Sequence, residues 1–126
     1  MRQEILSDRV VVHFSVDSVF DLDDHTHPGL EIGYGKDHKI VRLTFLDPRR
    51  RHTTDQVVVI ERYDPEADAL DVQLDEGVWH DTEESPLGFL IDYDSNRRIV
   101  ALEFLNASKL FPEAALARLR NAAQRR

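Results

Sequence analysis

The sequence contains no cysteine, and this absence excludes several kinds of chemistry. Without thiols the chain can form no disulfide, no thiolate nucleophile and no cysteine-based zinc or iron–sulfur site. Long apolar runs are also missing, so the sequence offers no membrane-spanning segment. The first residues, MRQEILSDR, contain neither an apolar signal-peptide core nor a small-residue cleavage site. We therefore expect a soluble, cytoplasmic protein with no membrane association.

Recognisable catalytic motifs are scarce as well. GYGKD at 33–37 lacks the spacing of a phosphate-binding P-loop, and no serine lies in a nucleophile elbow. Abundant carboxylates are expected in an acidic chain and do not by themselves indicate a glycosidase. The question of an enzyme stays open, and a non-enzymatic role is the expectation.

Positive charge is almost absent from the middle of the chain. Residues 60–107 carry 3 Lys/Arg against 13 Asp/Glu, whereas residues 1–59 carry 8 against 10 and residues 108–126 carry 5 against 1. An acidic surface repels phosphate backbones, so we expect no nucleic-acid binding except through the basic C-terminal tail. The complementary partner is a basic protein, and residues 61–84 are the segment expected to face it.

The chain repeats itself with a spacing of 59 residues. EIGYGKDHKIVRLTFLD at 31–47 aligns without a gap on LIDYDSNRRIVALEFLN at 90–106, with seven apolar or aromatic matches. The same offset places Val19 and Phe20 on Val78 and Trp79, and one residue of slip places VVVHF at 10–14 on LDVQL at 70–74. Two diverged copies of one unit, 1–50 and 57–107, therefore make up most of the chain.

Apolar residues alternate within each copy, which indicates half-buried strands. In IVRLTFL and IVALEFL every second residue is apolar, and GKDH and DSNR have the composition of hairpin turns. Each unit is thus predicted to be an antiparallel meander of three or four strands. One such unit buries too little surface alone, so the two are expected to share a core about a pseudo-twofold axis, as a sandwich or a barrel. Association with further copies of the chain stays open.

The C-terminal segment changes to a helical pattern. Pro112 suits a first helical position, Glu113 suits the positive end of the helix dipole, and Leu116 and Leu119 recur on one face. A helix over about 112–124 is expected to cover the sheets. The prediction is a single domain of α+β class over 1–126, mainly antiparallel, with two pseudo-symmetric units and a C-terminal helical segment over 108–126.

The second copy carries the motifs of a known family. YDPEADALDVQL followed by GFLIDYDSNRRIVALEFLNASK resembles the bacterial domain-of-unknown-function family 2283 over residues 57–110. Residues 2–50 resemble it only through the repeat, since the first copy lacks the YDPEAD turn and has Thr44 where the second has Glu103. The family carries no established activity. The resemblance implies at most a small protein that binds a toxin-like partner, as antitoxins do.

DLDDHTHPG at 21–29 is the candidate metal site. Imidazoles two residues apart in an extended chain point to one side, so His25 and His27 could bind zinc or a similar divalent ion. The neighbouring carboxylates would be further ligands; they are Asp21, Asp23 and Asp24. The corresponding stretch of the second copy, HDTEESPLG, keeps the acidity but only one histidine, which favours a solvated acidic loop instead.

A calcium-binding pattern is also present in part. Asp92, Asp94, Asn96 and Glu103 have the spacing of EF-hand positions 1, 3, 5 and 12. Arg97 stands where the loop needs glycine, and the following residues alternate as a strand, so a hairpin turn is the expectation. The predicted function is accordingly a non-enzymatic acidic module for protein–protein interaction or regulation. The alternative is a divalent-metal-binding protein that uses His25 and His27.

Overall fold

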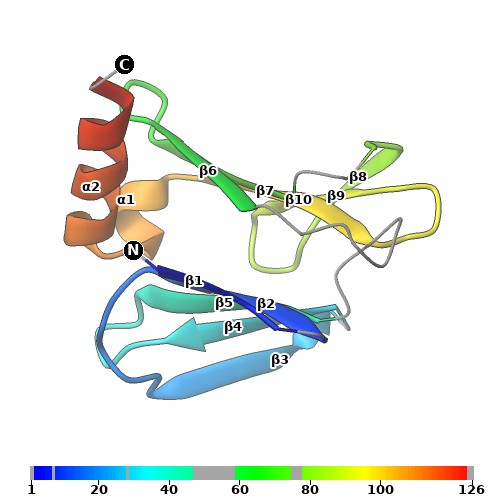
Figure 1. The fold of residues 1–126 in the computed structure, drawn as a ribbon, viewed down its shortest axis with the longest axis horizontal. Helices are drawn as coiled ribbons and strands as arrows, with labels where there is room; N and C mark the ends of the chain where they lie inside the picture. Colours follow the sequence, from blue (N-terminus) through cyan, green and yellow to red (C-terminus); the bar gives the residue numbers. More distant parts are fainter. Residues whose placement is uncertain (1, 7, 28, 47–58, 75–77, 125–126) are drawn as a thin grey trace.

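The computed structural model describes residues 2–6, 8–27, 29–46, 59–74 and 78–124 of the 126-residue chain. Two antiparallel sheets of five strands each and two helices make up the described part of the chain (Figure 1). The first sheet consists of β1 (Arg2–Ile5), β2 (Arg9–His13), β3 (Asp21–His27), β4 (Leu30–Tyr34) and β5 (Ile40–Leu46). The second consists of β6 (Val59–Asp64), β7 (Ala69–Leu74), β8 (Asp81–Glu84), β9 (Leu90–Tyr93) and β10 (Ile99–Leu105). The predicted α+β class with mainly antiparallel strands is confirmed.

The two sheets have the same strand order. It is β1-β2-β5-β4-β3 in the first and β6-β7-β10-β9-β8 in the second. In each sheet a hairpin is followed by a crossing to the far edge, and three further strands then return until the last one pairs with the second. The sequence predicted simple meanders of three or four strands. This prediction was wrong, because each unit has five strands and one crossing connection. The prediction fell short of five strands because short or polar strands such as β1 and β8 give little periodic signal.

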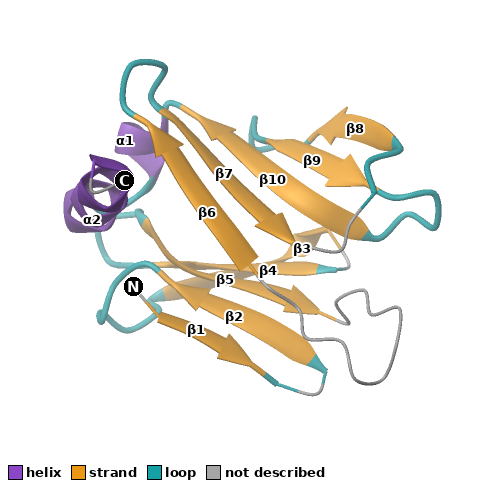
Figure 2. Cartoon of the chain, turned by 45° about the horizontal axis from the view of Figure 1, so that its top comes forward, coloured by secondary structure: helices purple, strands orange, loops and turns teal. Residues whose placement is uncertain are grey.

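One hydrophobic core lies between the two sheets, which face each other as two layers (Figure 2). Alternate residues of β2 and β7 point into it, and at these positions Val10, Val12, Leu70 and Val72 are completely buried. Gln3 Nε2 on β1 donates a hydrogen bond to the carbonyl oxygen of Val59 on β6 at 2.9 Å. The corresponding edge strands of the two sheets therefore lie side by side.

The C-terminal helices close one end of the sandwich. α1 (Ala107–Leu110) and α2 (Glu113–Gln124) follow the last strand, which confirms the predicted helix over 112–124. Leu116 is buried and Leu119 packs against the core, as their spacing predicted. Phe111, between the helices, is wholly buried and contacts Phe14, which directly follows β2, and Phe104 of β10. No helix in the described residues is long and apolar enough to span a membrane.

The predicted hairpin turns have the same geometry in both sheets. His38 and Arg97 both have φ of +65°, and they occupy the same position of the β4–β5 and β9–β10 turns. The amide of Gly35 donates to the carbonyl of Lys39 at 2.9 Å, and that of Asp94 donates to Arg98 at the same distance. The side chain of Asp94 accepts two further turn amides, those of Asn96 and Arg98. This segment is a hairpin, as expected, because β10 follows where an EF-hand would need a helix.

Candidate binding surface

The stretch DLDDHTH is an edge strand rather than a loop. Asp21–His27 form β3, which pairs only with β4 among the described strands. The prediction of a loop was therefore wrong, because the backbone of these residues is a β-strand. Alternation failed to reveal the strand because nearly every residue in it is polar. Charged side chains on an edge strand discourage pairing with another chain, and the exposed edge strand β8 is acidic too.

The metal-site prediction concerns side chains that are only partly described. The backbones of His25 and His27 belong to β3, but their side chains lie outside what the structure describes. Asp21 and Asp24 are exposed, and Asp23 is half-buried. Within the described residues, no group of three or more His, Asp or Glu side chains could hold a metal ion. The histidine site therefore stays a prediction.

The YDPEAD turn of the second unit is joined to the start of the first helix by hydrogen bonds to Asp68. Tyr63 Oη donates to Asp68 Oδ1 at 2.7 Å, and Ser108 Oγ donates to Asp68 Oδ2 at 2.6 Å. The backbone amide of Ser108 also donates to Asp68, at 2.9 Å. These hydrogen bonds hold the pKa of Asp68 below its usual range, and the bond from Ser108 Oγ has the largest effect. The YDPEAD turn and the NASK segment thus fix the first helix to the second sheet, and their role is architectural.

Carboxylates line the outward face of the second sheet. The strand registers place one row of residues directly across it, in the order Arg62, Asp71, Glu103, Leu90 and Glu84. Asp92 lies in the adjoining row, opposite Ala101 and Thr82. We call Asp71, Glu84, Asp92 and Glu103 the acidic face.

Asp71 and Glu103 occupy directly opposed positions on neighbouring strands. Their like charges repel each other, and such pairs destabilise a sheet. Burial first and then the charge of Asp92 raise the pKa of Asp71, although Arg62 acts in the opposite direction. Burial, Asp71 and Asp92 raise the pKa of Glu103. Keeping Asp71 and Glu103 ionised on the acidic face therefore costs free energy.

The fold does not require this arrangement. In the first sheet the registers place Val11 and Thr44 opposite each other, at the positions of Asp71 and Glu103. The uncharged pair belongs to a sheet of identical strand order. The carboxylates are thus a property of the second sheet's surface and not a condition for its formation.

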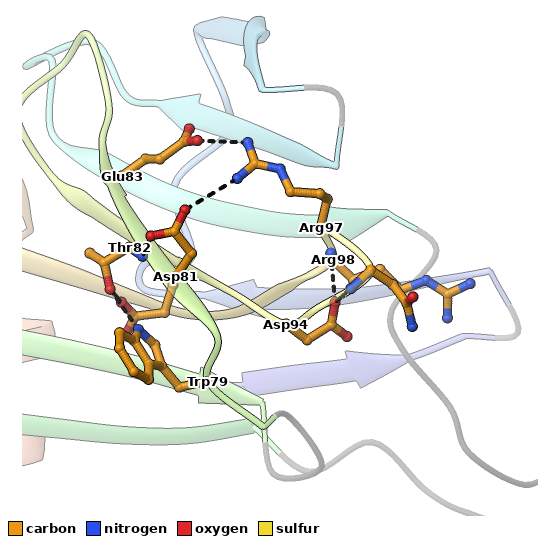
Figure 3. Close-up of polar contacts among 9 residues, drawn as sticks. Trp79, Asp81, Thr82, Glu83, Asp94, Arg97 and Arg98 are labelled. Atoms are coloured by element: carbon orange, nitrogen blue, oxygen red, sulfur yellow. Dashed lines mark hydrogen bonds and ion pairs between the residues drawn. The ribbon is translucent and has the colours of Figure 1, made fainter.

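An exposed tryptophan adjoins the acidic face. Trp79 has 63% of its surface exposed, and its Nε1 donates to Thr82 Oγ1 at 2.7 Å. Thr82 Oγ1 in turn donates to Asp92 Oδ1 at 2.5 Å, so the indole connects to the acidic face through one hydroxyl. Figure 3 shows the contact between Trp79 and Thr82 together with the ion pairs around Arg97.

Arg97 pairs with Glu83 and Asp81, which do not belong to the acidic face. Its guanidinium lies 2.7 Å from Glu83 and 3.8 Å from Asp81, on β8, and stacks over the ring of Tyr93 at 4.3 Å. Glu83 and Asp81 oppose Ile91 and Tyr93, which are buried on the inward side of the sheet. Among the described residues of the five-member row, Arg62 is the one cation.

The sequence predicted a basic partner for residues 61–84 but did not identify this surface. Asp71 and Glu84 lie inside that segment, whereas Asp92 and Glu103 follow it. The carboxylates come together only through the strand order, since β10 lies between β7 and β9. Alternation in IVALEFL did place Glu103 on the face opposite the apolar triad, and this was the available signal.

Comparison with known proteins identifies one family. Residues 62–108 match the family described as Protein of unknown function (DUF2283), from within β6 to the second residue of α1. No curated protein and no solved structure gives a significant match to the chain. The matched segment contains Asp71, Glu84, Asp92 and Glu103, so the whole acidic face lies within the part of the chain that is similar to this family.

Proposed function

We propose that the protein is a non-enzymatic binding module whose acidic face docks a basic segment of another protein. The observation that carries the proposal is the opposed pair Asp71 and Glu103. Burial is the largest cause of both raised pKa values; the charge of Asp92 adds to the shift of Asp71, and the charges of Asp71 and Asp92 add to that of Glu103. A Lys or Arg side chain placed between them would relieve this repulsion. The free energy of binding would then include the relief of the repulsion between carboxylates that exists in the unbound protein.

The exposed Trp79 supports a protein ligand over a simple cation. Aromatic side chains are enriched at protein interfaces, where they bury a large area and lose little conformational entropy. The face of a tryptophan ring also attracts guanidinium and ammonium groups, so Trp79 would favour a ligand that carries them. A carboxylate surface beside an exposed indole suits an Arg/Lys-rich peptide.

The first sheet is proposed to be a diverged copy of the same family unit. The identical strand orders, the equal φ of His38 and Arg97, and the 59-residue sequence spacing support this view. The binding surface has diverged along with the sequence, since Val11 and Thr44 replace the opposed carboxylates. A regulatory role, with a toxin-like protein as the basic partner, would use the acidic face in the second copy alone.

The single tryptophan of the chain makes the proposal directly testable. A tryptophan-free peptide rich in Lys and Arg is titrated into the full chain while the emission of Trp79 is followed. We expect a saturable spectral change whose Kd weakens as salt is raised, because exposed charge pairs are screened within about 8 Å at physiological ionic strength. The double variant Asp71→Asn/Glu103→Gln should bind roughly tenfold more weakly, as expected when two charge contacts are lost.

A charge-matched control separates the acidic face from net charge. Glu31→Gln/Glu113→Gln removes two negative charges from the first sheet and from the start of α2. This control should bind nearly as well as the unmodified protein. Equal losses in the two double variants, or binding insensitive to salt, would contradict a specific acidic docking surface. Sedimentation without peptide should show no salt-sensitive self-association, since that would make a second copy the occupant.

A further inference from the structure

The first sheet carries an open groove that the proposed protein-binding function does not use. It has a volume of about 440 Å³ and is lined by residues of β2, β5, α2 and the segment between β2 and β3. The polar members are His13, Ser15, Asp17, Ser18, Arg42 and Arg118. The volume falls in the range of small-molecule sites, which is roughly 300–1,000 Å³.

A glycine allows the β2–β3 segment to pack closely beside Arg42. A Cβ on Gly33 would lie 2.7 Å from Val19 Cγ2 and 3.3 Å from Arg42 Cβ. A larger residue would therefore push Val19 off the sheet. The corresponding residue of the second sheet is Asp92. Gly33 directly precedes Tyr34, and Asp92 directly precedes Tyr93, and both tyrosines pair with the first residue of the edge strand. The groove is thus specific to the first unit.

The side chain of Arg42 has an unused hydrogen-bond donor. Its Nε is buried without a hydrogen-bond partner among the described residues. Buried donors are nearly always paired, so Arg42 has unused hydrogen-bonding capacity beside the groove that it lines. At the corresponding position the second sheet has Ala101, opposite Gln73, where the first has Arg42 opposite His13. The arginine is therefore not needed to form this kind of sheet.

The remaining polar groups suit an oxyanion. Arg118 contributes a second, exposed guanidinium from α2, and Ser15 and Ser18 contribute hydroxyl groups. Ser15 Oγ already accepts the amide of Asp17 at 3.1 Å, which leaves its proton available to a ligand. His13 is engaged with Glu4, at 2.6 Å. Guanidinium groups bind phosphate through parallel, charge-assisted hydrogen bonds.

We propose that this groove binds the phosphate group of a small organic phosphate. Arg42 and Arg118 hold the oxyanion, with help from the serine hydroxyls. The organic part of the ligand contacts Val16, Val19 and Val41, which form the apolar part of the lining. Asp17 opposes the ligand's charge and limits the affinity. The site lies on the opposite sheet from the acidic face, so the two ligands would not compete.

Calorimetry on the full chain tests the proposal with phenyl phosphate and inorganic phosphate as probes, at constant ionic strength set with chloride. We expect phenyl phosphate to bind more tightly than inorganic phosphate. Arg118→Gln should weaken binding roughly tenfold, the effect of losing one charge-assisted contact. Arg120→Gln is the matched control, because Arg120 lies on the same helix over the ring of Tyr63, outside the groove. It should change affinity by less than about twofold.

Asp17→Asn supplies an opposite prediction, since it should tighten the binding of both probes. No binding by either probe would overturn the proposal, as would equal losses in Arg118→Gln and Arg120→Gln. Weaker binding of the phosphates by Asp17→Asn would show that this carboxylate assists binding instead of opposing it, and would also overturn the proposal. If the two probes bind equally, the organic part of the proposal is wrong. Arg118 is exposed, so its substitution leaves the core intact.

Discussion

Asp71 on β7 and Glu103 on β10 lie directly opposite each other on the outward face of the second sheet, and both have raised pKa values. Neutralising Glu103 should stabilise the protein by about 0.5 kcal/mol, the usual size of a cross-strand charge effect. Neutralising Asp71 should gain less, because it also loses the attraction of Arg62 on the neighbouring strand. The double variant should gain little more, because the first substitution already removes the mutual repulsion. Urea unfolding at pH 7 measures these differences, and additive effects would show that the carboxylates do not interact.

Glu61 predicts a second, pH-dependent effect on stability. It points to the inward side of β6, opposite Val72, and its Oε1 is buried without a hydrogen-bond partner among the described residues. Burial raises the pKa of Glu61 above its ordinary value of 4.5, and Gln3 opposes the shift. The folded protein therefore holds this proton more tightly than the unfolded chain, so the free energy of unfolding falls as pH rises through 4.5 towards the raised pKa.

Glu61→Gln removes that dependence. At pH 7 the variant should be more stable than the unmodified protein by roughly 1 kcal/mol, because leaving a buried group unpaired costs more for a charged carboxylate than for a neutral amide. The difference should vanish near pH 3, where Glu61 is protonated in both states. Urea unfolding over this pH range measures it, and a constant difference at all pH values would be inconsistent with a titrating Glu61.

The two equivalent turns give a matched pair of backbone substitutions. His38 and Arg97 both have φ of +65°, a conformation that costs most side chains about 1 kcal/mol and glycine almost nothing. His38→Gly should therefore stabilise the protein by about 0.5 kcal/mol, after allowing for the greater flexibility of the unfolded chain. Arg97→Gly should gain less, because it also loses the contacts to Glu83 and Tyr93. Thermal unfolding ranks the two, and destabilisation by His38→Gly would contradict the turn geometry.

The hydrogen bonds around Asp68 predict which family-motif residues matter for folding. Asp68→Ala should lower the Tm by several degrees, because Tyr63 and Ser108 both lose their acceptor. Ser108→Ala should have a smaller effect, because its backbone amide still reaches Asp68. Binding of a basic peptide by the folded variants should stay unchanged, since neither residue belongs to the acidic face. A loss of peptide binding without a loss of stability would show that the motif acts in recognition.

Much of the architecture follows from the sequence, because its signals are periodic and repeated. The alternation in IVRLTFL and IVALEFL located β5 and β10, and the two turn sequences located the hairpins. The repeat also indicated that the units share one core. Its 59-residue register fails at one edge, however: Asp21 and Asp81 both pair with the tyrosine before the turn, which is an offset of 60. Val19 and Phe20 are therefore not equivalent to Val78 and Trp79.

The binding surfaces follow from the sequence much less completely. The acidic face depends on β7, β10, β9 and β8 lying side by side, and the crossing between the second and third strand of each unit determines this order. The groove beside Arg42 depends on a helix from the far end of the chain, which brings in Arg118. Composition indicated a basic partner for the acidic region, but only tertiary structure brings these carboxylates together.

The most direct test of the central claim is an NMR titration of the isotope-labelled full chain with a Lys/Arg-rich peptide. Perturbed amides would show where the peptide binds, independently of affinity. We expect the largest shifts in β7, β9 and β10 and at the indole of Trp79, with little change in β2 and β5. Shifts confined to the first sheet, or spread evenly over exposed carboxylates, would contradict docking at the acidic face.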